Sequence, residues 1–138
     1  MSYKFPTPNV PVSWGELIDK ITILEIKDIK ITSPVANQNI KNELKLLSAI
    51  ASVTDDQDAV QLHKKELTEV NLKLWVVEDS IREKELAGEF DDVFIELARS
   101  VYKLNDVRAK TKKAINSLLL SELVEEKSYK DFLANFGH

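Results

Sequence analysis

The feature that most limits the possible folds is the scarcity of helix-breaking residues beyond the start of the chain. Three of the four prolines are Pro6, Pro8 and Pro11, and the whole chain has only three glycines. Closely spaced prolines disfavour helix in the residues that precede them, so residues 1–12 are predicted to form an extended N-terminal arm. The remainder of the chain can then form long helices joined by few loops.

Apolar residues recur at helical spacing in four segments after this arm. We predict that these helices cover residues 14–31, 34–53, 58–87 and 91–118. Ser13 and Glu16 form a capping-box pattern at the start of the first helix, where a side chain accepts a hydrogen bond from an otherwise unpaired backbone amide. Gly88 is placed to end the third helix in a left-handed conformation. The helix boundaries are therefore marked by the sequence itself.

The third and fourth helices are predicted to be much longer than the first two, each about 40–45 Å at about 1.5 Å per residue. Two long neighbours with a short connection pack as an antiparallel pair. The predicted fold is therefore all-α, an antiparallel helical bundle with a long hairpin of the third and fourth helices and a shorter hairpin of the first and second. Residues 13–120 form the four-helix domain, and residues 121–138 form a C-terminal tail with a short helix.

The predicted first helix has a broad apolar arc that contains two acidic residues. The apolar members of the arc are Trp14, Leu17, Ile18, Ile21, Leu24, Ile29 and Ile31. At about 100° per residue they span an arc wide enough to pack against more than one neighbour. Glu25 and Asp28 fall inside it, and a carboxylate in an apolar face costs several kcal/mol unless it is paired or protonated. We therefore expect another segment or a ligand to interact with both carboxylates.

The candidate site is the set of polar residues that helical phase turns inward on three helices. It consists of Glu25, Asp28, Asn71, Glu78, Asn105, Arg108 and Lys112. In one interpretation, Arg108 forms a structural ion pair with Glu25 or Glu78 and fixes the register of the helices. In the other, the cluster lines a pocket between helices that holds a small ligand.

A second acidic pattern suggests an enzyme as the alternative. Glu66-x-x-Glu69 followed by Glu89-x-x-Asp92 is similar to the ExxE…ExxD motif of all-α nucleotide pyrophosphohydrolases, which gather carboxylates around Mg²⁺. By helical phase, however, Glu66 and Glu69 point away from the apolar seam of their helix. We therefore predict no metal site and no cofactor, and a small-molecule or nucleotide-handling enzyme is the alternative function.

Composition narrows the classes of partner. The net charge is −4, which gives no basic surface for nucleic acid, and there is no cysteine. No stretch approaches the roughly 20 apolar residues of a membrane span. We predict a cytoplasmic, non-catalytic binding or assembly module that forms a homo-oligomer or binds a protein partner, and that accepts a small polar ligand. Its self-association would use the apolar face of the first helix or the projecting end of the long hairpin.

Several segments together resemble a known family. They are Ser13–Lys27, Leu74–Arg82, Phe90–Asn116 and Ser121–Tyr129. In these segments the chain resembles a family of small uncharacterised bacterial and phage proteins of unknown function, some of them fused to or found beside sugar-processing domains. The resemblance implies an all-α domain and a connection to glycan or surface-polysaccharide metabolism. It implies no catalytic residue.

Overall fold

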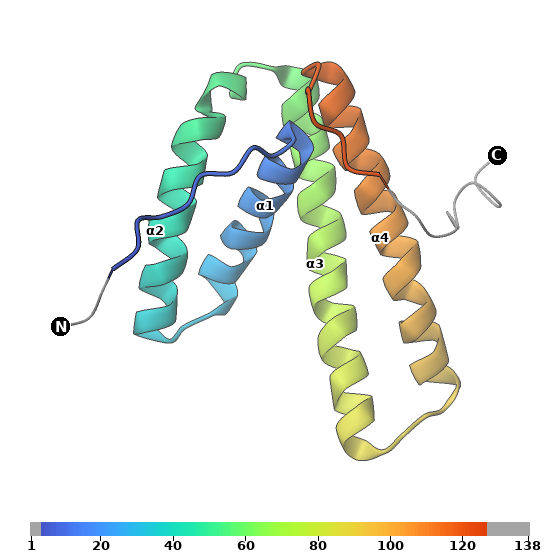
Figure 1. The fold of residues 1–138 in the computed structure, drawn as a ribbon. Coiled ribbons are helices and arrows are strands. Elements are labelled where there is room, and N and C mark those ends of the chain that lie inside the picture. The colour runs from blue at the N-terminus through green and yellow to red at the C-terminus, as the bar shows by residue number, and fades with distance from the viewer. Residues whose placement is uncertain (1–3, 127–138) are drawn as a thin grey trace.

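The computed structural model describes residues 4–126, which form four α-helices and one short 3₁₀ helix (Figure 1). These elements are α1 (Trp14–Lys30), α2 (Pro34–Ala51), the 3₁₀ helix η1 (Ser52–Thr54), α3 (Asp58–Ala87) and α4 (Asp92–Leu118). Residues 4–126 contain no β-strand. The predicted fold class is therefore confirmed, and the predicted range of α3 is the observed one. The predicted second helix, to residue 53, ends instead at Ala51 and gives way to η1.

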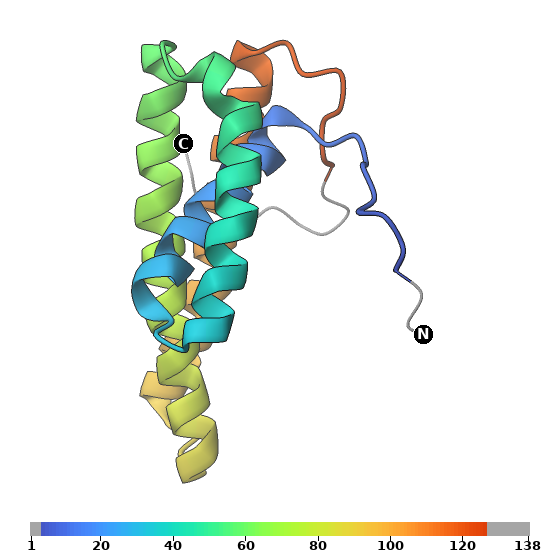
Figure 2. The same cartoon turned by 90° about the vertical axis from the view of Figure 1, so that its left-hand side faces the viewer.

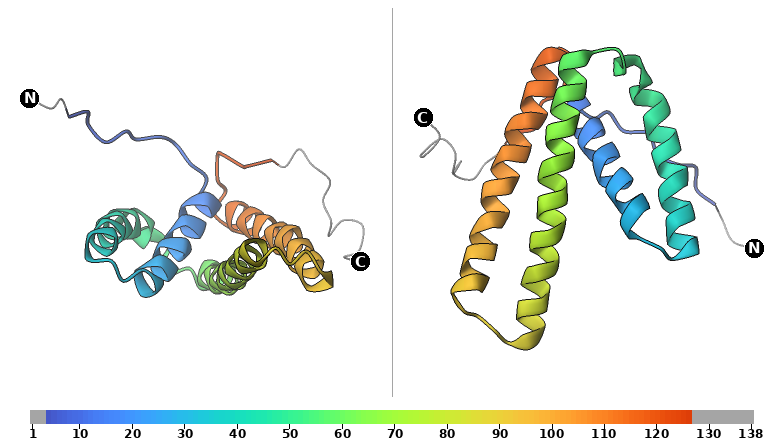
Figure 3. Two further views of the ribbon diagram at one scale, coloured as in Figure 1. Left: turned by 90° about the horizontal axis from the view of Figure 1, so that it is seen from below. Right: turned by 180° about the vertical axis from the view of Figure 1, so that it is seen from behind.

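The helices form two antiparallel hairpins that meet at one end and diverge toward the other (Figure 1). The α3–α4 hairpin continues well past the ends of α1 and α2 (Figure 2). Seen from below and from behind, α1 lies between α2 and the long hairpin (Figure 3). It packs against α2, α3 and α4, whereas α2 packs chiefly against α1. This confirms the prediction that the first helix has more than one neighbour.

The core consists of two apolar clusters that share α1. Between α1 and the long hairpin, Ile18 packs with Val60, Leu67 and Ile115, all of them buried. Between α1 and α2, the cluster contains Leu17, Ile21 and Ala51, with Leu44 and Leu47 partly buried against them. Trp14 packs against both clusters, so the start of α1 is the point where the two hairpins are joined.

The local signals at the helix ends are mostly those expected. Ser13 Oγ accepts a hydrogen bond from the Glu16 amide at 3.1 Å, but the Glu16 carboxylate pairs with Lys112 of α4, at 2.7 Å. Gly88 has φ of 67° and its amide donates to the Glu85 carbonyl, which closes α3. Asp91 caps α4 by accepting from the Phe94 amide at 3.0 Å. Side-chain caps therefore mark the starts of α1 and α4, whereas neither Ser33 before α2 nor Gln57 before α3 accepts a capping hydrogen bond.

One part of the predicted apolar arc is wrong. Ile29 is 80% exposed, while Ile26, which lay outside the predicted arc, is buried. Ile29 belongs to the end of α1 at which the two hairpins diverge, so no neighbouring helix covers it (Figure 1). A second line of buried residues runs along α1 instead, made of Gly15, Asp19, Thr22 and Ile26. Because α1 lies between two partners, more of its circumference is buried than its apolar residues indicate.

The segments outside the helices are described only in part. Residues 4–12 have no regular secondary structure, as predicted for the arm. Residues 121–126 are not helical, and the rest of the predicted short C-terminal helix lies outside the described residues. Ser121 fixes the start of this tail, because its Oγ accepts a hydrogen bond from the Trp14 amide at 3.3 Å. The division of the chain at residues 12 and 120 stays a prediction.

Candidate functional site

A buried ion pair joins α1 to α4. Asp19 of α1 is 1% exposed. Arg108 of α4 donates from Nε to Asp19 Oδ1 and Oδ2, at 3.0 and 3.1 Å, and from Nη2 to Oδ2 at 2.5 Å. The bonds from two guanidinium nitrogens fix both groups in orientation as well as in distance. The hydrogen bonds that Arg108 donates to Asp19 raise the pKa of Arg108 above its ordinary value, although burial opposes this shift.

Asn71 brings α3 into the same network. Its side-chain amide donates to Asp19 Oδ1 and to Thr22 Oγ1, each at 2.9 Å. Thr22 is itself buried, and its hydroxyl donates to the Asp19 carbonyl at 2.7 Å. The Asp19 carboxylate thus receives hydrogen bonds from α3 and α4, which is what a buried charge requires. The network fixes the positions of three helices relative to one another.

A cavity of about 390 Å³ opens beside this ion pair, between α1, α3 and α4. The residues that line it are Ile23, Ile26, Asn71, Leu74, Trp75, Glu78, Asp79, Arg82, Asn105 and Arg108. One part of the wall is apolar and aromatic, and the other carries two guanidinium groups, two carboxylates and two side-chain amides. Cavities of this size and mixed character hold small ligands through a few placed polar groups.

The charges around the cavity are nearly balanced. Arg108 is bound to Asp19, and Arg82 Nη1 lies 3.5 Å from Glu78 Oε2. Asp79 adds a further carboxylate to the wall. The side chain of Arg108 is 28% exposed, so its outer edge faces the cavity while its inner edge is held by the buried carboxylate. The site therefore presents both donors and acceptors and no excess of positive charge.

The structure brings four of the seven predicted site residues to this cavity. Asn71, Glu78, Asn105 and Arg108 all line it. The prediction that Arg108 pairs with Glu25 or Glu78 is wrong, because Arg108 binds Asp19 instead. Whether the four residues bind a ligand stays a prediction.

The other three predicted residues lie elsewhere. Glu25 Oε1 is 3.2 Å from Lys64 Nζ, without hydrogen-bond geometry. Asp28 faces α2, where Lys41 Nζ lies 2.9 Å from its Oδ1 and Asn37 donates to the same oxygen. The hydrogen bond from Lys41 lowers the pKa of Asp28. The expected counter-charges for Glu25 and Asp28 are thus present, but each carboxylate has its own lysine instead of sharing Arg108.

Sequence reasoning missed Asp19, although a signal for it exists. Gly15, Asp19, Thr22 and Ile26 recur at helical spacing and form the buried line described above. Small and polar residues at such positions do not register as an apolar face, so Asp19 is absent from the predicted site residues. Read together with an inward Arg108 on another helix, this line would have pointed to the pair.

Lys112 belongs to a separate ion-pair group that holds the segment after α4. Its Nζ lies 2.7 Å from Glu16 Oε2 and 2.8 Å from Glu125 Oε2. Burial alone would lower the pKa of Lys112, but its hydrogen bonds to Glu125 and Glu16, together with the negative charges of Glu16 and Asp19, outweigh burial and raise it. The hydrogen bond from Lys112 lowers the pKa of Glu125. Lys112 thus connects the start of α1, α4 and the tail.

We expect this tail contact to be lost in acid. Since the folded pKa of Glu125 is depressed, the contact contributes fully above the ordinary glutamate pKa of about 4.3 and is lost as the pH falls through the lowered folded value. The measurement is an NMR titration of the Glu125 side-chain carboxyl carbon. Its midpoint should lie below the ordinary value and return to it in Lys112→Gln. An ordinary midpoint in the unsubstituted protein would contradict the contact.

The acidic pattern of the enzyme alternative is spread along the long hairpin. Glu66 lies near the start of α3, and its carboxylate is 3.0 Å from His63 Nδ1. Glu89 follows the other end of α3, which is about 30 Å away at about 1.5 Å per residue. One Mg²⁺ cannot bind carboxylates that far apart. Within residues 4–126, no group of three or more His, Asp or Glu side chains is placed to hold a metal ion. The enzyme alternative stays a prediction.

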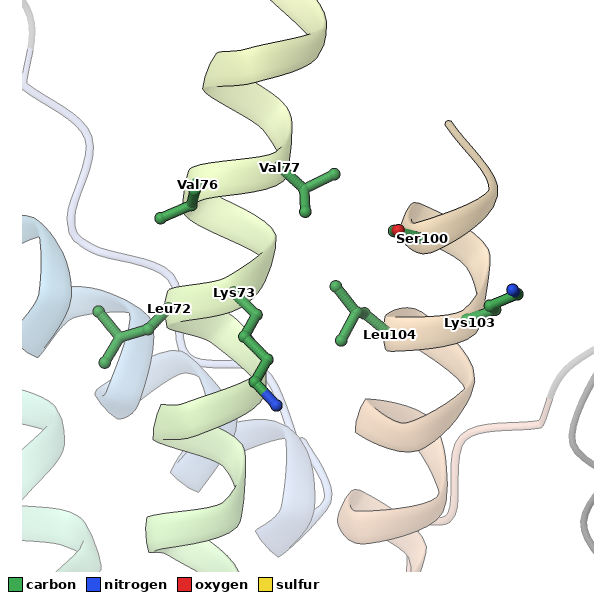
Figure 4. A pocket seen from close by; sticks show the side chains of 7 residues that line it. All are labelled: Leu72, Lys73, Val76, Val77, Ser100, Lys103 and Leu104. Atoms are coloured by element: carbon green, nitrogen blue, oxygen red, sulfur yellow. The ribbon is translucent and has the colours of Figure 1, made fainter. Parts of the chain in front are cut away.

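An apolar groove lies on the other face of the long hairpin. It has a volume of about 580 Å³ and is lined by Leu72, Lys73, Val76, Val77, Ser100, Lys103 and Leu104 (Figure 4). On α3, the groove uses residues 72, 73, 76 and 77, whereas the cavity uses residues 71, 74, 75 and 78. At about 100° per residue these two sets lie on opposite sides of the helix. The cavity and the groove therefore lie on opposite sides of α3, and of these two α1 borders only the cavity.

Comparison with known proteins places the chain in a family without giving a function. No curated protein and no solved structure matches it. None of the described helices is long and apolar enough to cross a membrane. A family model described as a family of unknown function, DUF6165, matches residues 9–136. Since this match covers nearly the whole chain, the protein belongs to the DUF6165 family.

Proposed function

We propose that this protein is a non-catalytic helical binding and assembly module whose cavity takes a small, neutral, polyhydroxylated ligand. The observation that carries the proposal is the wall in which Arg108 is fixed by buried Asp19 while its outer edge lines the open cavity. A guanidinium group held in this way loses little side-chain entropy when it binds a ligand. The site is therefore preorganised.

The balance of charge favours a neutral ligand over an anion. Asp19, Glu78 and Asp79 together offset Arg82 and Arg108, so a phosphate or carboxylate would meet at least as much negative as positive charge. Hydroxyl groups both donate and accept, and they can bind carboxylates, amides and guanidinium groups in one site. A polyhydroxylated ligand uses all of these groups.

The apolar part of the cavity fits the carbon skeleton of such a ligand. Trp75 of α3 lines the cavity together with Ile26 and Leu74. The face of an indole ring packs well against C–H groups, and its large area contributes much of the contact energy of a site. A sugar ring has both a hydroxyl-rich edge and a C–H face. We therefore propose a sugar or related polyol as the chemical class of ligand.

This ligand class agrees with the connection to glycan or surface-polysaccharide metabolism that the family resemblance implies. A bacterial or phage origin and a cytoplasmic location are further parts of the proposal, and both rest on the sequence alone. The nucleotide-handling alternative would instead require a metal-dependent reaction, which the separation of Glu66 from Glu89 disfavours.

The test is an NMR titration with neutral mono- and disaccharides, with sugar phosphates and inorganic phosphate as the charged comparison. The indole resonance of Trp75, assigned with Trp75→Phe, should shift with a neutral sugar. Arg82→Gln should weaken binding by roughly tenfold, the effect of losing about 1.5 kcal/mol from one charged hydrogen bond. Arg82 pairs with Glu78 through an exposed side chain.

The matched control is Arg99→Gln on α4. Arg99 is also an exposed arginine paired with a glutamate one turn away, Glu96, but it does not line the cavity. The Arg99→Gln substitution should leave the affinity for the neutral sugar unchanged. Two results would overturn the ligand class: no shift with any neutral sugar, or shifts caused by phosphates alone. Equal loss of affinity in both variants would place the binding outside the cavity.

A further inference from the structure

The groove lies on the face of the α3–α4 hairpin opposite the cavity, and part of its lining is open to solvent. Val76 is 58% exposed and Leu72 is 39% exposed. Figure 4 shows Val77 and Leu104 pointing into the space between the two helices. Further exposed apolar residues continue the same face by helical phase, among them Leu62 of α3 and Val93 of α4. An apolar strip along a whole helix pair is typical of an interface.

Charge is divided between the two ends of this hairpin. The turn half, residues 78–99, has eight acidic and three basic residues. The base half, residues 58–77 together with 100–118, has four acidic and eight basic residues. The groove, at residues 72–77 and 100–104, lies at the boundary between the two halves. Counted around the whole circumference of both helices, the hairpin is thus acidic at one end and basic at the other. Of the basic half, Lys64, Arg108 and Lys112 are paired with α1 residues away from the groove.

We propose that two copies of this chain pair face to face through this groove, antiparallel, with the acidic turn of each hairpin on the basic half of the other. This pairing rests on the assembly role proposed above and gives it a surface. A twofold axis that crosses the hairpin at the groove places α3 on α3 and α4 on α4 of the second copy. The other face-to-face arrangement, with the axis along the hairpin, would place one acidic turn on the other, which like charges disfavour.

Individual residues fit the first arrangement. In the sequence, Lys65 lies nine residues before Leu74 and Glu83 lies nine residues after it. With the axis at Leu74, Lys65 of one copy faces Glu83 of the other, and this occurs twice. Leu72 and Val76 are also symmetric about Leu74, so the exposed apolar side chains of the groove meet each other. The face is about 40 Å long and about 20 Å wide, on the order of 800 Å² per copy, the size of a standard specific interface.

The surfaces predicted from sequence for self-association are thereby replaced in part. The apolar face of α1 is used inside the molecule, where Leu17, Ile18 and Ile21 are buried. The projecting end of the long hairpin is retained, but as the acidic end of a longer face. The second copy is favoured over another protein because one chain supplies both complementary halves.

The test is analytical ultracentrifugation of the full chain through the micromolar range. Lys65→Glu and Glu83→Lys should each weaken dimerisation by on the order of tenfold, because each creates two like-charge contacts, and the double variant should restore it. Glu85→Lys is the matched control, because it makes the same charge change near the turn on the opposite side of α3. It should leave the dimer unchanged. Circular dichroism checks that every variant is folded.

Two outcomes would overturn the pairing. A wild-type chain that remains a monomer throughout would rule out pairing through the groove. If the wild-type chain dimerises but the double variant does not regain wild-type dimerisation, another face is used. The same conclusion follows if Glu85→Lys weakens dimerisation as much as the single variants do. Neither outcome affects the sugar titration, which reports on the opposite side of the hairpin. A dimer without sugar binding would retain the assembly role and remove only the ligand.

Discussion

Replacing Arg108 with methionine is expected to lower the free energy of unfolding by about 3–5 kcal/mol, a large part of the about 5–15 kcal/mol that stabilises a domain of this kind. Methionine keeps much of the side-chain volume but leaves the Asp19 carboxylate, which is 1% exposed, without a counter-charge. Asn71 would still donate one hydrogen bond to it. Urea unfolding followed by circular dichroism measures the change.

The double variant Arg108→Met with Asp19→Asn separates the lost charge from lost packing. Asparagine keeps the acceptor for the Asn71 amide and removes the buried negative charge, so most of the lost stability should return. Little change in Arg108→Met alone would contradict the role of the pair. A folded Arg108→Met protein that no longer shifts with sugar would show that Arg108 also contacts the ligand.

Gly15→Ala should have the second-largest effect, a destabilisation of about 1–3 kcal/mol. Gly15 lies where α1 crosses α4, and its amide donates to Asn116 Oδ1 at 2.7 Å. An added methyl group would overlap the Lys112 carbonyl oxygen and lie 3.0 Å from Asn116 Oδ1. Since the first of these is backbone, the helices must separate. By helix propensity alone, alanine in place of glycine would stabilise the helix by about 1 kcal/mol. The close contact with α4 therefore decides whether Gly15→Ala stabilises or destabilises the protein.

The readout for this variant is thermal unfolding together with the fluorescence of Trp14, its neighbour in the chain, which packs against both core clusters. Because the chain has a second tryptophan, Trp75, the fluorescence is measured in the Trp75→Phe background. Gly15→Ala should change both. Gly88→Ala is the comparison, because Gly88 has no atom within 4 Å of the added group and adopts φ of 67°, so it adds only backbone strain at the distant turn. It should lower stability without altering Trp14. A stabilised Gly15→Ala protein would mean that the two helices are not in close contact.

Four of the seven candidate residues could be placed at the cavity from the sequence. Asn71, Glu78, Asn105 and Arg108 share it because α3 and α4 form one hairpin, and helical phase along a hairpin fixes which side chains meet. Glu25, Asp28 and Lys112 were assigned to the same cluster by phase alone. Phase does not tell which neighbouring helix a side chain meets, and each of these residues met a nearer partner of opposite charge.

The helices, their ends and the long hairpin follow from local information: apolar periodicity, the cap at Ser13, the left-handed Gly88 and the scarcity of breakers after Pro11. The placement of α1 does not follow from local information. Its position between α2 and the long hairpin buries the line of Gly15, Asp19, Thr22 and Ile26 and leaves Ile29 exposed. A buried carboxylate is stable only opposite a matched cation, and which cation lies opposite depends on how helices pack, an arrangement that no single helix encodes.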